Sequence, residues 1–359
     1  MRDRVPARAR VLRQAARGAA ACALLAVSGA ILCAPAPAVA VKSIAVMTPE
    51  DPNDYGWNQQ GFEAARAVAR KYGLAFMPAT GLGYGDVHAQ ARELADDGAS
   101  LIIAHASGYN TAVPEVGAEK HVPVAIVDRP AASQPGAVAD YTPSGHEGAY
   151  LAGVLAARST QTRTVGIVVS AESPPWNTHS AAFAQGARAT DARLKVLYAV
   201  IGPAAYSDAA GARRVTAAVI AAGADVIFGQ GDGASFGMLQ AVETTPSSGG
   251  GKVWFIDVVG DKTPIDKGNL LSSVVWNLVP VYSAMVEDLS ANRFGTRRYA
   301  IRLGDDSVQL LHTRYIPGDV WSELMVIRQR IVAGDLKIEP VADIAGVHAL
   351  MSAVTRPPR

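Results

Sequence analysis

The chain contains little cysteine: only Cys22 and Cys33 occur among its 359 residues, and both lie within the first 40. The remainder therefore cannot form a disulfide bond, a cysteine-based metal site or a thiol nucleophile. Histidine is sparse too, and its seven positions lack the H-x-x-x-H and H-E-x-x-H spacings of zinc sites. We therefore expect neither a metal nor a cofactor.

The chain also lacks a surplus of charge. Its net charge is +1, and the first 40 residues contribute +5 through six arginines and one aspartate, so the remainder carries −4. A mildly acidic chain without a basic run is a poor binder of nucleic acid or of anionic membranes. It has no G-x-S-x-G nucleophile elbow, and its glycine-rich segment 81–85 lacks the lysine of a phosphate-binding loop. We therefore expect no nucleic-acid partner and no enzymatic activity.

The first 40 residues have the pattern of a secretory signal peptide. An arginine-rich head precedes an apolar run over 18–34, and Ala38-Val39-Ala40 places small residues before a cut at Val41. Pro35 and Pro37 interrupt the apolar stretch, which is shorter than the roughly 20 residues that span a membrane. We therefore predict a cleaved signal over 1–40 and an exported protein.

The cysteines of this segment do not favour a lipid anchor. A lipidated cysteine normally follows a small residue, but Cys33 follows Leu32, and Cys22 comes too early in the apolar run. We predict a periplasmic or extracellular location, associated with the cell surface, and a lipid anchor is disfavoured.

Beyond residue 40, short apolar runs rich in β-branched residues alternate with segments of helical periodicity. In one such segment Phe62, Ala65, Ala69 and Tyr72 repeat at helical spacing before Gly73. The predicted strands are 43–47, 75–79, 100–104, 122–127, 165–169, 195–199, 226–229, 253–256 and 271–275. Apolar strands that alternate with amphipathic helices indicate parallel sheets covered on both faces. Roughly nine units exceed one ordinary sheet, so we predict an α/β protein with two doubly wound lobes joined by a hinge.

Three breaks in this pattern indicate where the chain crosses between the lobes. They lie at 140–145, 272–277 and 299–305. We therefore assign 41–143 and 276–305 to an N-terminal lobe. Residues 144–275 and 306–350 form the predicted C-terminal lobe.

Aromatic residues make up only 6% of the chain, yet five of them fall at or near the ends of predicted strands. In open α/β sheets, ligands bind beyond the carboxyl ends of the strands. The aromatic residues at these ends are Tyr55, Trp57, Tyr109, Trp176 and Trp276, and the polar ones include Asn58, Asn110, Asp128, Asn177, Asp232 and Asn277. Flat faces together with in-plane hydrogen-bonding groups suit a flat heteroaromatic ligand.

Each of these residues also has a purely structural interpretation. Trp57 starts a helix and could pack into a core, and Asn58 could be a hydrogen-bonding residue of the helix start. Asp232 lies between glycines, where a turn residue is common, and Trp276 could fill the hinge. Trp176 follows two prolines in a polar segment that we interpret as a loop, so core packing explains it less well.

Three segments, in this order, resemble the basic membrane protein family. Members of this family are exported receptors of ABC importers for purine nucleosides and related compounds. The segments are Asn53-Asp54-Tyr55-Gly56-Trp57-Asn58 followed by Gly61, Glu147-Gly148-Ala149-Tyr150-Leu151-Ala152-Gly153, and Phe183-Ala184-Gln185-Gly186-Ala187-Arg188. The resemblance covers most of the chain after residue 40.

The resemblance implies that Trp57 stacks on a base and that Asn58 contacts its edge. In the segment 257–262, Val259 takes the place of the family's ribose-binding aspartate, and Trp276 replaces a lysine that reaches the sugar. Two sugar contacts are thus missing. Gly56-Trp57 and Val274-Val275-Trp276-Asn277 are similar to a subgroup that binds a free base such as adenine.

Together these observations predict a hinge-closing binding protein of the type I periplasmic-binding-protein architecture. The expected ligand is a purine base or nucleoside, held between the lobes, and the expected partner is an ABC permease; we expect a monomer. The predicted ligand-binding residues are Tyr55, Trp57, Asn58, Asp128, Trp176, Asp232 and Trp276.

Other functions remain open. The ligand could be a sugar or another small polar molecule. A ligand-sensing domain is a further class, although the chain is predicted to be exported. A secreted nucleoside hydrolase would need a calcium-binding carboxylate cluster, for which Glu50, Asp51 and Asp54 are the candidates.

Overall fold

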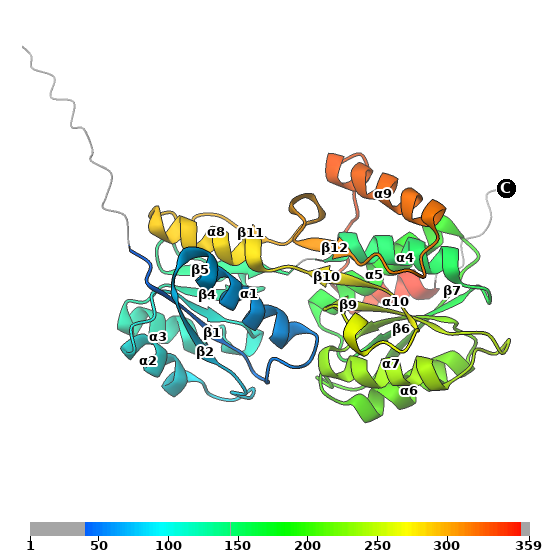
Figure 1. The fold of residues 1–359 in the computed structure, drawn as a ribbon, viewed down its shortest axis with the longest axis horizontal. Helices are drawn as coiled ribbons and strands as arrows, with labels where there is room; N and C mark the ends of the chain where they lie inside the picture. Colours follow the sequence, from blue (N-terminus) through cyan, green and yellow to red (C-terminus); the bar gives the residue numbers. More distant parts are fainter. Residues whose placement is uncertain (1–39, 144, 353–359) are drawn as a thin grey trace, which may run out of the picture. The chain divides into compact units, whose positions relative to one another are not determined.

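The structure is a computed structural model that describes residues 40–143 and 145–352 (Figure 1). The predicted signal peptide and both cysteines lie outside the described residues, except for Ala40 at the predicted cut. The rest of the chain forms two six-stranded sheets, called sheet A and sheet B below.

Sheet A is parallel throughout and has the strand order β11-β5-β4-β3-β1-β2. Its strands are β1 (Ser43–Met47), β2 (Ala75–Ala79), β3 (Ile102–Ala104), β4 (Val124–Val127), β5 (Val138–Thr142) and β11 (Tyr299–Ala300). The central strands β1, β3 and β4 are buried along their whole length, as expected for parallel strands covered on both faces.

Sheet B has the order β12-β10-β9-β8-β6-β7, and only its edge strand β12 is antiparallel to its neighbour. Its strands are β6 (Thr164–Val169), β7 (Lys195–Val200), β8 (Val226–Gln230), β9 (Trp254–Val259), β10 (Leu270–Trp276) and β12 (Val308–Leu310).

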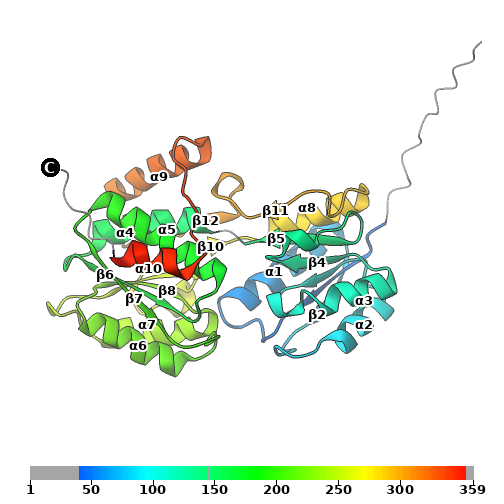
Figure 2. The same cartoon turned by 180° about the vertical axis from the view of Figure 1, so that it is seen from behind.

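Helices cover both faces of each sheet (Figures 1 and 2). On sheet A, α1 (Trp57–Tyr72) and α8 (Val279–Ser290) lie opposite α2 (His88–Asp96) and α3 (Ala112–Lys120). On sheet B, α4 (His146–Ser159) and α5 (Pro174–Thr190) lie opposite α6 (Ala209–Ala221) and α7 (Ser235–Thr244).

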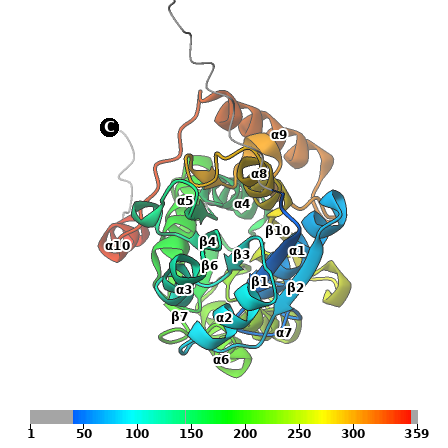
Figure 3. The same cartoon turned by 90° about the vertical axis from the view of Figure 1, so that its left-hand side faces the viewer.

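The described part of the chain ends in two further helices, both packed on other helices (Figure 3). α9 (Gly318–Ala333) contacts α4, and α10 (Ile344–Ser352) contacts α5. Short 3-10 helices lie in the connections: η1 (Ser107–Tyr109), η2 (Pro130–Ala132), η3 (Asp232–Ala234), η4 (Thr263–Ile265) and η5 (Leu303–Asp305). Within the described ranges, no helix is long and apolar enough to cross a membrane.

The helices α4 and α5 approach each other closely at two glycines. A Cβ atom added at Gly153 would overlap the carbonyl oxygen of Phe183, and one added at Gly186 would overlap that of Tyr150. These glycines belong to two of the segments that carry the family resemblance. Their physical role is therefore to let the two helix backbones meet.

The two-sheet α/β fold that the sequence predicts is confirmed, and all nine predicted strands coincide with strands of the structure. One prediction is wrong: residues 140–142, expected to be part of a break, form the end of β5. The buried carboxylate of Asp140 interrupts the apolar pattern there, yet it accepts a hydrogen bond from the Arg129 N–H at 2.5 Å. The edge strands β11 and β12 are too short to be recognised in the sequence.

The chain passes between the sheets three times, after β5, after β10 and after β11. Each strand belongs to the lobe that its sheet forms. Trp276, the last residue of β10, therefore belongs to sheet B. The limits of the two lobes along the sequence stay a prediction.

Candidate functional site

A cavity of about 670 Å³ lies between loops from both sheets. Most of its wall comes from the carboxyl ends of strands and from the hinge, as the strand-end rule predicts. The lining residues are Pro49, Trp57, Asn58, Tyr84, Ala106, Ser107, Gly108, Val127, Asp128, Pro130, Thr142, Pro143, Ser173, Pro174, Pro175, Trp176, Thr178, Tyr206, Asp232, Trp276, Arg298 and Ala342. Six of the seven predicted ligand-binding residues are among them; the exception is Tyr55.

Trp57 is the first residue of α1 and is half-buried at the cavity wall. Its ring stacks on the imidazole of His105, with centroids 3.6 Å apart and an interplanar angle of 13°. Its Nε1–H donates to the carbonyl oxygen of His105 at 2.9 Å. The indole is therefore fixed from behind while part of it borders the cavity.

His105 is fully buried and bonded at both ring nitrogens. One nitrogen, Nε2, lies 2.8 Å from the carbonyl oxygen of Trp57, which can only accept, so Nε2 carries the proton. The other, Nδ1, lies 2.7 Å from the hydroxyl of Tyr141 and 2.9 Å from that of Tyr282. Burial lowers the pKa of His105 to about 3, so the ring is neutral.

The sequence did not single out His105, because the histidines are scattered along the chain. Two signals could have revealed it. It directly follows the buried strand β3, and the helix that packs over it has glycine at position 61, where a Cβ atom would overlap the imidazole.

Asn58 is bonded as a residue of the helix start. Its Nδ2 donates to Asp54 Oδ2 at 2.8 Å, and its Oδ1 accepts from the Glu50 N–H at 3.3 Å. Asp54 also accepts the backbone N–H groups of Gly56, Asn58 and Gln59, so its carboxylate satisfies the free amides at the start of α1. Asn58 nevertheless lines the cavity, and its contact with a ligand stays a prediction.

Trp176 does not lie in a loop, contrary to our expectation. Pro174, Pro175 and Trp176 form the first turn of α5, where proline is favourable because its missing N–H would be unbonded anyway. The indole is largely buried, and its Nε1–H donates to Ser170 Oγ at 3.2 Å. It still borders the cavity, and its centroid lies 6.3 Å from that of Trp276.

Trp276 connects the two sets of aromatic residues. Its ring centroid lies 6.1 Å from that of Trp57, at 87°, in an edge-to-face arrangement. The indole is 2% exposed, and its Nε1 has no hydrogen-bond partner in the described part of the chain. The structure thus brings three tryptophans, distant in sequence, to one cavity.

Two carboxylates at the cavity have raised pKa values. Burial, followed by the charge of Asp140, raises the pKa of Asp128 to about 7, while Arg298 acts in the opposite direction. Burial, followed by the charge of Asp54, raises the pKa of Asp232 to about 8, and Lys262 opposes this shift.

Asp232 also joins the two sheets. It follows β8 of sheet B, and its Oδ1 accepts the backbone N–H of Trp57, at the start of α1, at 3.3 Å. Its side chain therefore contacts the same turn that carries the stacking indole.

Tyr55 lies outside the cavity lining, although the sequence placed it in the site. Its backbone has a positive φ of 47°, and its carbonyl oxygen accepts a hydrogen bond from Lys262 Nζ at 3.0 Å. Its ring packs edge-on against Phe236, with centroids 6.3 Å apart. Both the carbonyl oxygen and the ring of Tyr55 therefore contact residues on the side of sheet B.

Lys262 is fully buried and forms an ion pair with Asp257, which is also fully buried. Ser235 donates to the other carboxylate oxygen of Asp257 at 2.9 Å. This pair cannot be anticipated from the sequence, because the segment 257–262 resembles only a degraded ribose-binding motif. Together, Lys262 and Asp232 hold the turn before α1 from the opposite sheet.

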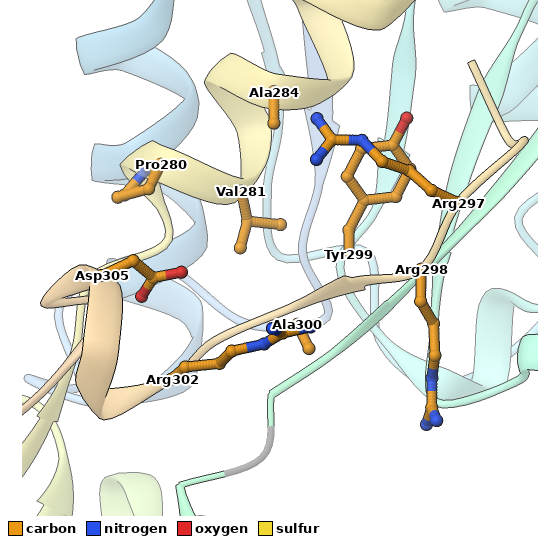
Figure 4. A pocket seen from close by; sticks show the side chains of 9 residues that line it. All are labelled: Pro280, Val281, Ala284, Arg297, Arg298, Tyr299, Ala300, Arg302 and Asp305. Carbon is orange, nitrogen blue, oxygen red and sulfur yellow. The ribbon is translucent and has the colours of Figure 1, made fainter. Parts of the chain in front are cut away.

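Arg298 is the one cationic side chain that lines the cavity among the residues the structure describes, and the sequence missed it. It also borders a smaller cavity of about 180 Å³, which Arg297, Arg302 and Asp305 line as well (Figure 4). The candidate carboxylates of a hydrolase calcium site, in contrast, do not gather. In the described ranges no group of three or more histidines or carboxylates could hold a metal ion.

Two α/β sheets with a cavity at their strand ends are the fold of two-lobed solute-binding proteins. Residues 41–317 match the family model described as the PnrA-like substrate-binding proteins of ABC transporters. The chain belongs to this family.

Similar proteins of known name or structure agree with this assignment. Over 132 residues the chain is 30% identical to the ABC transporter nucleoside-binding protein BmpA of Lactococcus lactis. The aligned region covers 36% of this chain and 37% of that relative. A solute-binding protein of an ABC transporter from Aeropyrum pernix superposes with a TM-score of 0.73 at 15% identity, covering 87% of this chain and 97% of the other. A solute-binding protein of an ABC transporter from Conexibacter woesei superposes with a TM-score of 0.68 at 18% identity, covering 84% of this chain and 100% of the other. These structural likenesses concern the fold.

Proposed function

We propose that the protein is the exported receptor of an ABC importer and that it binds a purine base or nucleoside without chemical conversion. The observation that carries this proposal is the indole of Trp57, rigidly held by His105 at the wall of the 670 Å³ cavity. Small-molecule sites typically measure about 300–1,000 Å³ and combine apolar walls with a few polar groups. The name of the Lactococcus relative, a nucleoside-binding protein, supports the same ligand class.

In this proposal the ligand ring stacks on Trp57, with Trp176 and Trp276 completing the aromatic wall. Asp128 and Asp232 are the candidates for hydrogen bonds to the ring edges, and Asn58 can offer the second N–H of its amide, because Nδ2 donates only one to Asp54. Stacking between a base and an aromatic side chain is worth about 1–3 kcal/mol. The aromatic wall therefore accounts for a substantial part of the affinity.

Closure of the two lobes around the ligand is the proposed signal to a membrane permease. Hinge closure of this kind is common among periplasmic binding proteins. The contacts of Asp232 and Lys262 with the turn before α1 support a closed arrangement in this structure. We further propose that the receptor acts as a monomer outside the cytoplasm.

Isothermal titration of the purified protein with adenine, guanine, adenosine, guanosine and ribose tests the ligand class. We expect binding of at least one purine and no binding of ribose alone. Ribose binding without any response to purines would contradict the proposal and favour a sugar receptor.

Replacing the stacking ring tests the site itself. Trp57→Ala should weaken binding of the preferred purine by about 1–3 kcal/mol, or roughly 5- to 150-fold. Trp254→Ala is a matched control, because this tryptophan packs against Tyr315 and does not line the cavity. Equal losses in the two variants would show that Trp57 does not contact the ligand.

A further inference from the structure

Arg298 and Asp128 lie at the ends of two strands of sheet A, β11 and β4, which flank β5 on opposite sides. Asp128 directly follows β4, and its N–H donates to the carbonyl oxygen of Tyr141 in β5 at 3.0 Å. Arg298 directly precedes β11, whose first residue, Tyr299, pairs with the same Tyr141. A cationic and an anionic side chain therefore border one stretch of the cavity wall.

The side chain of Arg298 points away from its neighbour Arg297. Successive side chains of an extended strand alternate in direction, and Figure 4 shows the two arginines on opposite sides of the chain. Arg297 is engaged with Asp288, its Nε lying 2.5 Å from Oδ2. Arg298 lines the large cavity, and its positive charge opposes the rise in pKa that burial causes at Asp128 and Asp140.

The guanidinium of Arg298 forms no hydrogen bond or ion pair with any other residue that the structure describes. An arginine carries five N–H donors and cannot lose its charge. Arg298 is exposed, so water can solvate these donors in the absence of a ligand. A ligand that presents acceptors toward Arg298 and a donor toward the carboxylate of Asp128 would pair with both side chains.

We propose that Arg298 and Asp128 together read one edge of a 6-oxopurine. In this arrangement the ring N1–H donates to Asp128, while O6 and N7 accept from Arg298. Arginine recognises O6 and N7 of guanine in this way, whereas the adenine edge places an amino group at position 6, where it would face a second set of donors. The inference rests on the proposed function and narrows its ligand class, whereas the family resemblance alone pointed to adenine.

The test compares hypoxanthine with adenine, and inosine with adenosine, by titration of the purified protein and two variants. Arg298→Met removes the guanidinium and keeps an unbranched side chain. Arg302→Met is the matched control, because Arg302 lines the smaller cavity and not the large one. Thermal unfolding of both variants reports whether either change disturbs the fold.

We expect the wild-type protein to bind hypoxanthine at least about tenfold more tightly than adenine. Arg298→Met should weaken hypoxanthine at least about tenfold and adenine less than about threefold, and Arg302→Met should leave both unchanged. Tighter binding of adenine by the wild type, or equal losses for both bases in Arg298→Met, overturns the inference. So does an equal loss for inosine and adenosine with unchanged base binding, which would place ribose at Arg298.

Failure of the proposed function gives a different result. In that case no purine binds to the folded wild-type protein at all. Selective binding of adenine that Arg298→Met does not change, in contrast, leaves the purine receptor intact and removes only the 6-oxopurine assignment.

Discussion

The position of Trp57 depends on His105, which contacts it through the ring face and through two hydrogen bonds. The imidazole is in turn held between the hydroxyls of Tyr141 and Tyr282, which come from β5 and α8. A residue that does not itself line the cavity thus determines where the stacking surface lies.

Replacing His105 should therefore weaken ligand binding, although His105 itself does not line the cavity. His105→Phe keeps a ring beneath Trp57 but leaves the Trp57 carbonyl and the tyrosine hydroxyls without their partner. Each buried polar group left unbonded costs about 1–3 kcal/mol. We expect a lower melting temperature and about tenfold weaker purine binding in titration.

His105→Gln is the control, because its amide offers both N–H donors and an oxygen acceptor and should restore much of the affinity. The edge-to-face pair of Trp57 and Trp276 should also give a near-ultraviolet circular dichroism signal that Trp57→Phe removes. If His105→Phe keeps both this signal and the wild-type affinity, His105 does not position the indole.

At the scale of elements, the contact between α4 and α5 depends on glycine at positions 153 and 186. Overpacking in a tight interface typically costs about 1–3 kcal/mol. Gly153→Ala should therefore lower the free energy of unfolding by at least this amount, measured by urea denaturation.

Gly318→Ala, in the first turn of α9, serves as the matched helical control. An added Cβ atom there meets no atom within 4 Å, so this variant should keep or slightly raise the stability. Equal stability of the Gly153 and Gly318 variants would show that the two helices can separate at little cost.

The elements also show what could be predicted from the sequence. Long apolar strands such as β1 and β6 were recognisable because burial on both faces leaves a continuous apolar run. β5 was missed because Asp140 interrupts it, and the two-residue strand β11 owes its conformation to its neighbour.

The site was predictable to the extent that residues closely follow strands, as Asp128 does directly after β4 and Asp232 does two positions after the end of β8. Lys262 and Arg298 could not be found in this way. The bond from Lys262 to Tyr55 joins residues 207 positions apart, and such a contact leaves no local pattern. Arg298 stands in an exposed basic stretch that is indistinguishable from a solvated surface.

At the scale of the whole molecule, the proposed closure of the two lobes would be linked to protonation of Asp232 through its contact with the α1 turn. In this structure burial and the charge of Asp54 raise the pKa of Asp232 to about 8. When the lobes separate, both causes weaken and the pKa falls toward its ordinary value of about 3.9. The closed form therefore binds a proton more tightly than the open form.

Ligand affinity should accordingly be highest at low pH, fall as the pH rises toward 8, and level off above it. The decrease cannot exceed tenfold per pH unit for one proton. Titration of a neutral purine nucleoside between pH 5.5 and 9 measures it. Asp232→Asn should remove this part of the decrease and leave the contribution of Asp128, whose pKa is about 7. An unchanged pH profile in Asp232→Asn would show that closure is not coupled to protonation of Asp232.

The three passages between the sheets have a consequence for biosynthesis. A nascent chain that ends after β5 already contains Trp57 and His105, but it lacks Tyr282 and the edge strand β11. The wall that carries the indole is thus complete only in a chain that extends beyond β10 of the other sheet. A product terminated after β10 would contain every strand of the two sheets except the edge strands β11 and β12, and it would still lack Tyr282 behind the indole and Arg298 in the cavity wall.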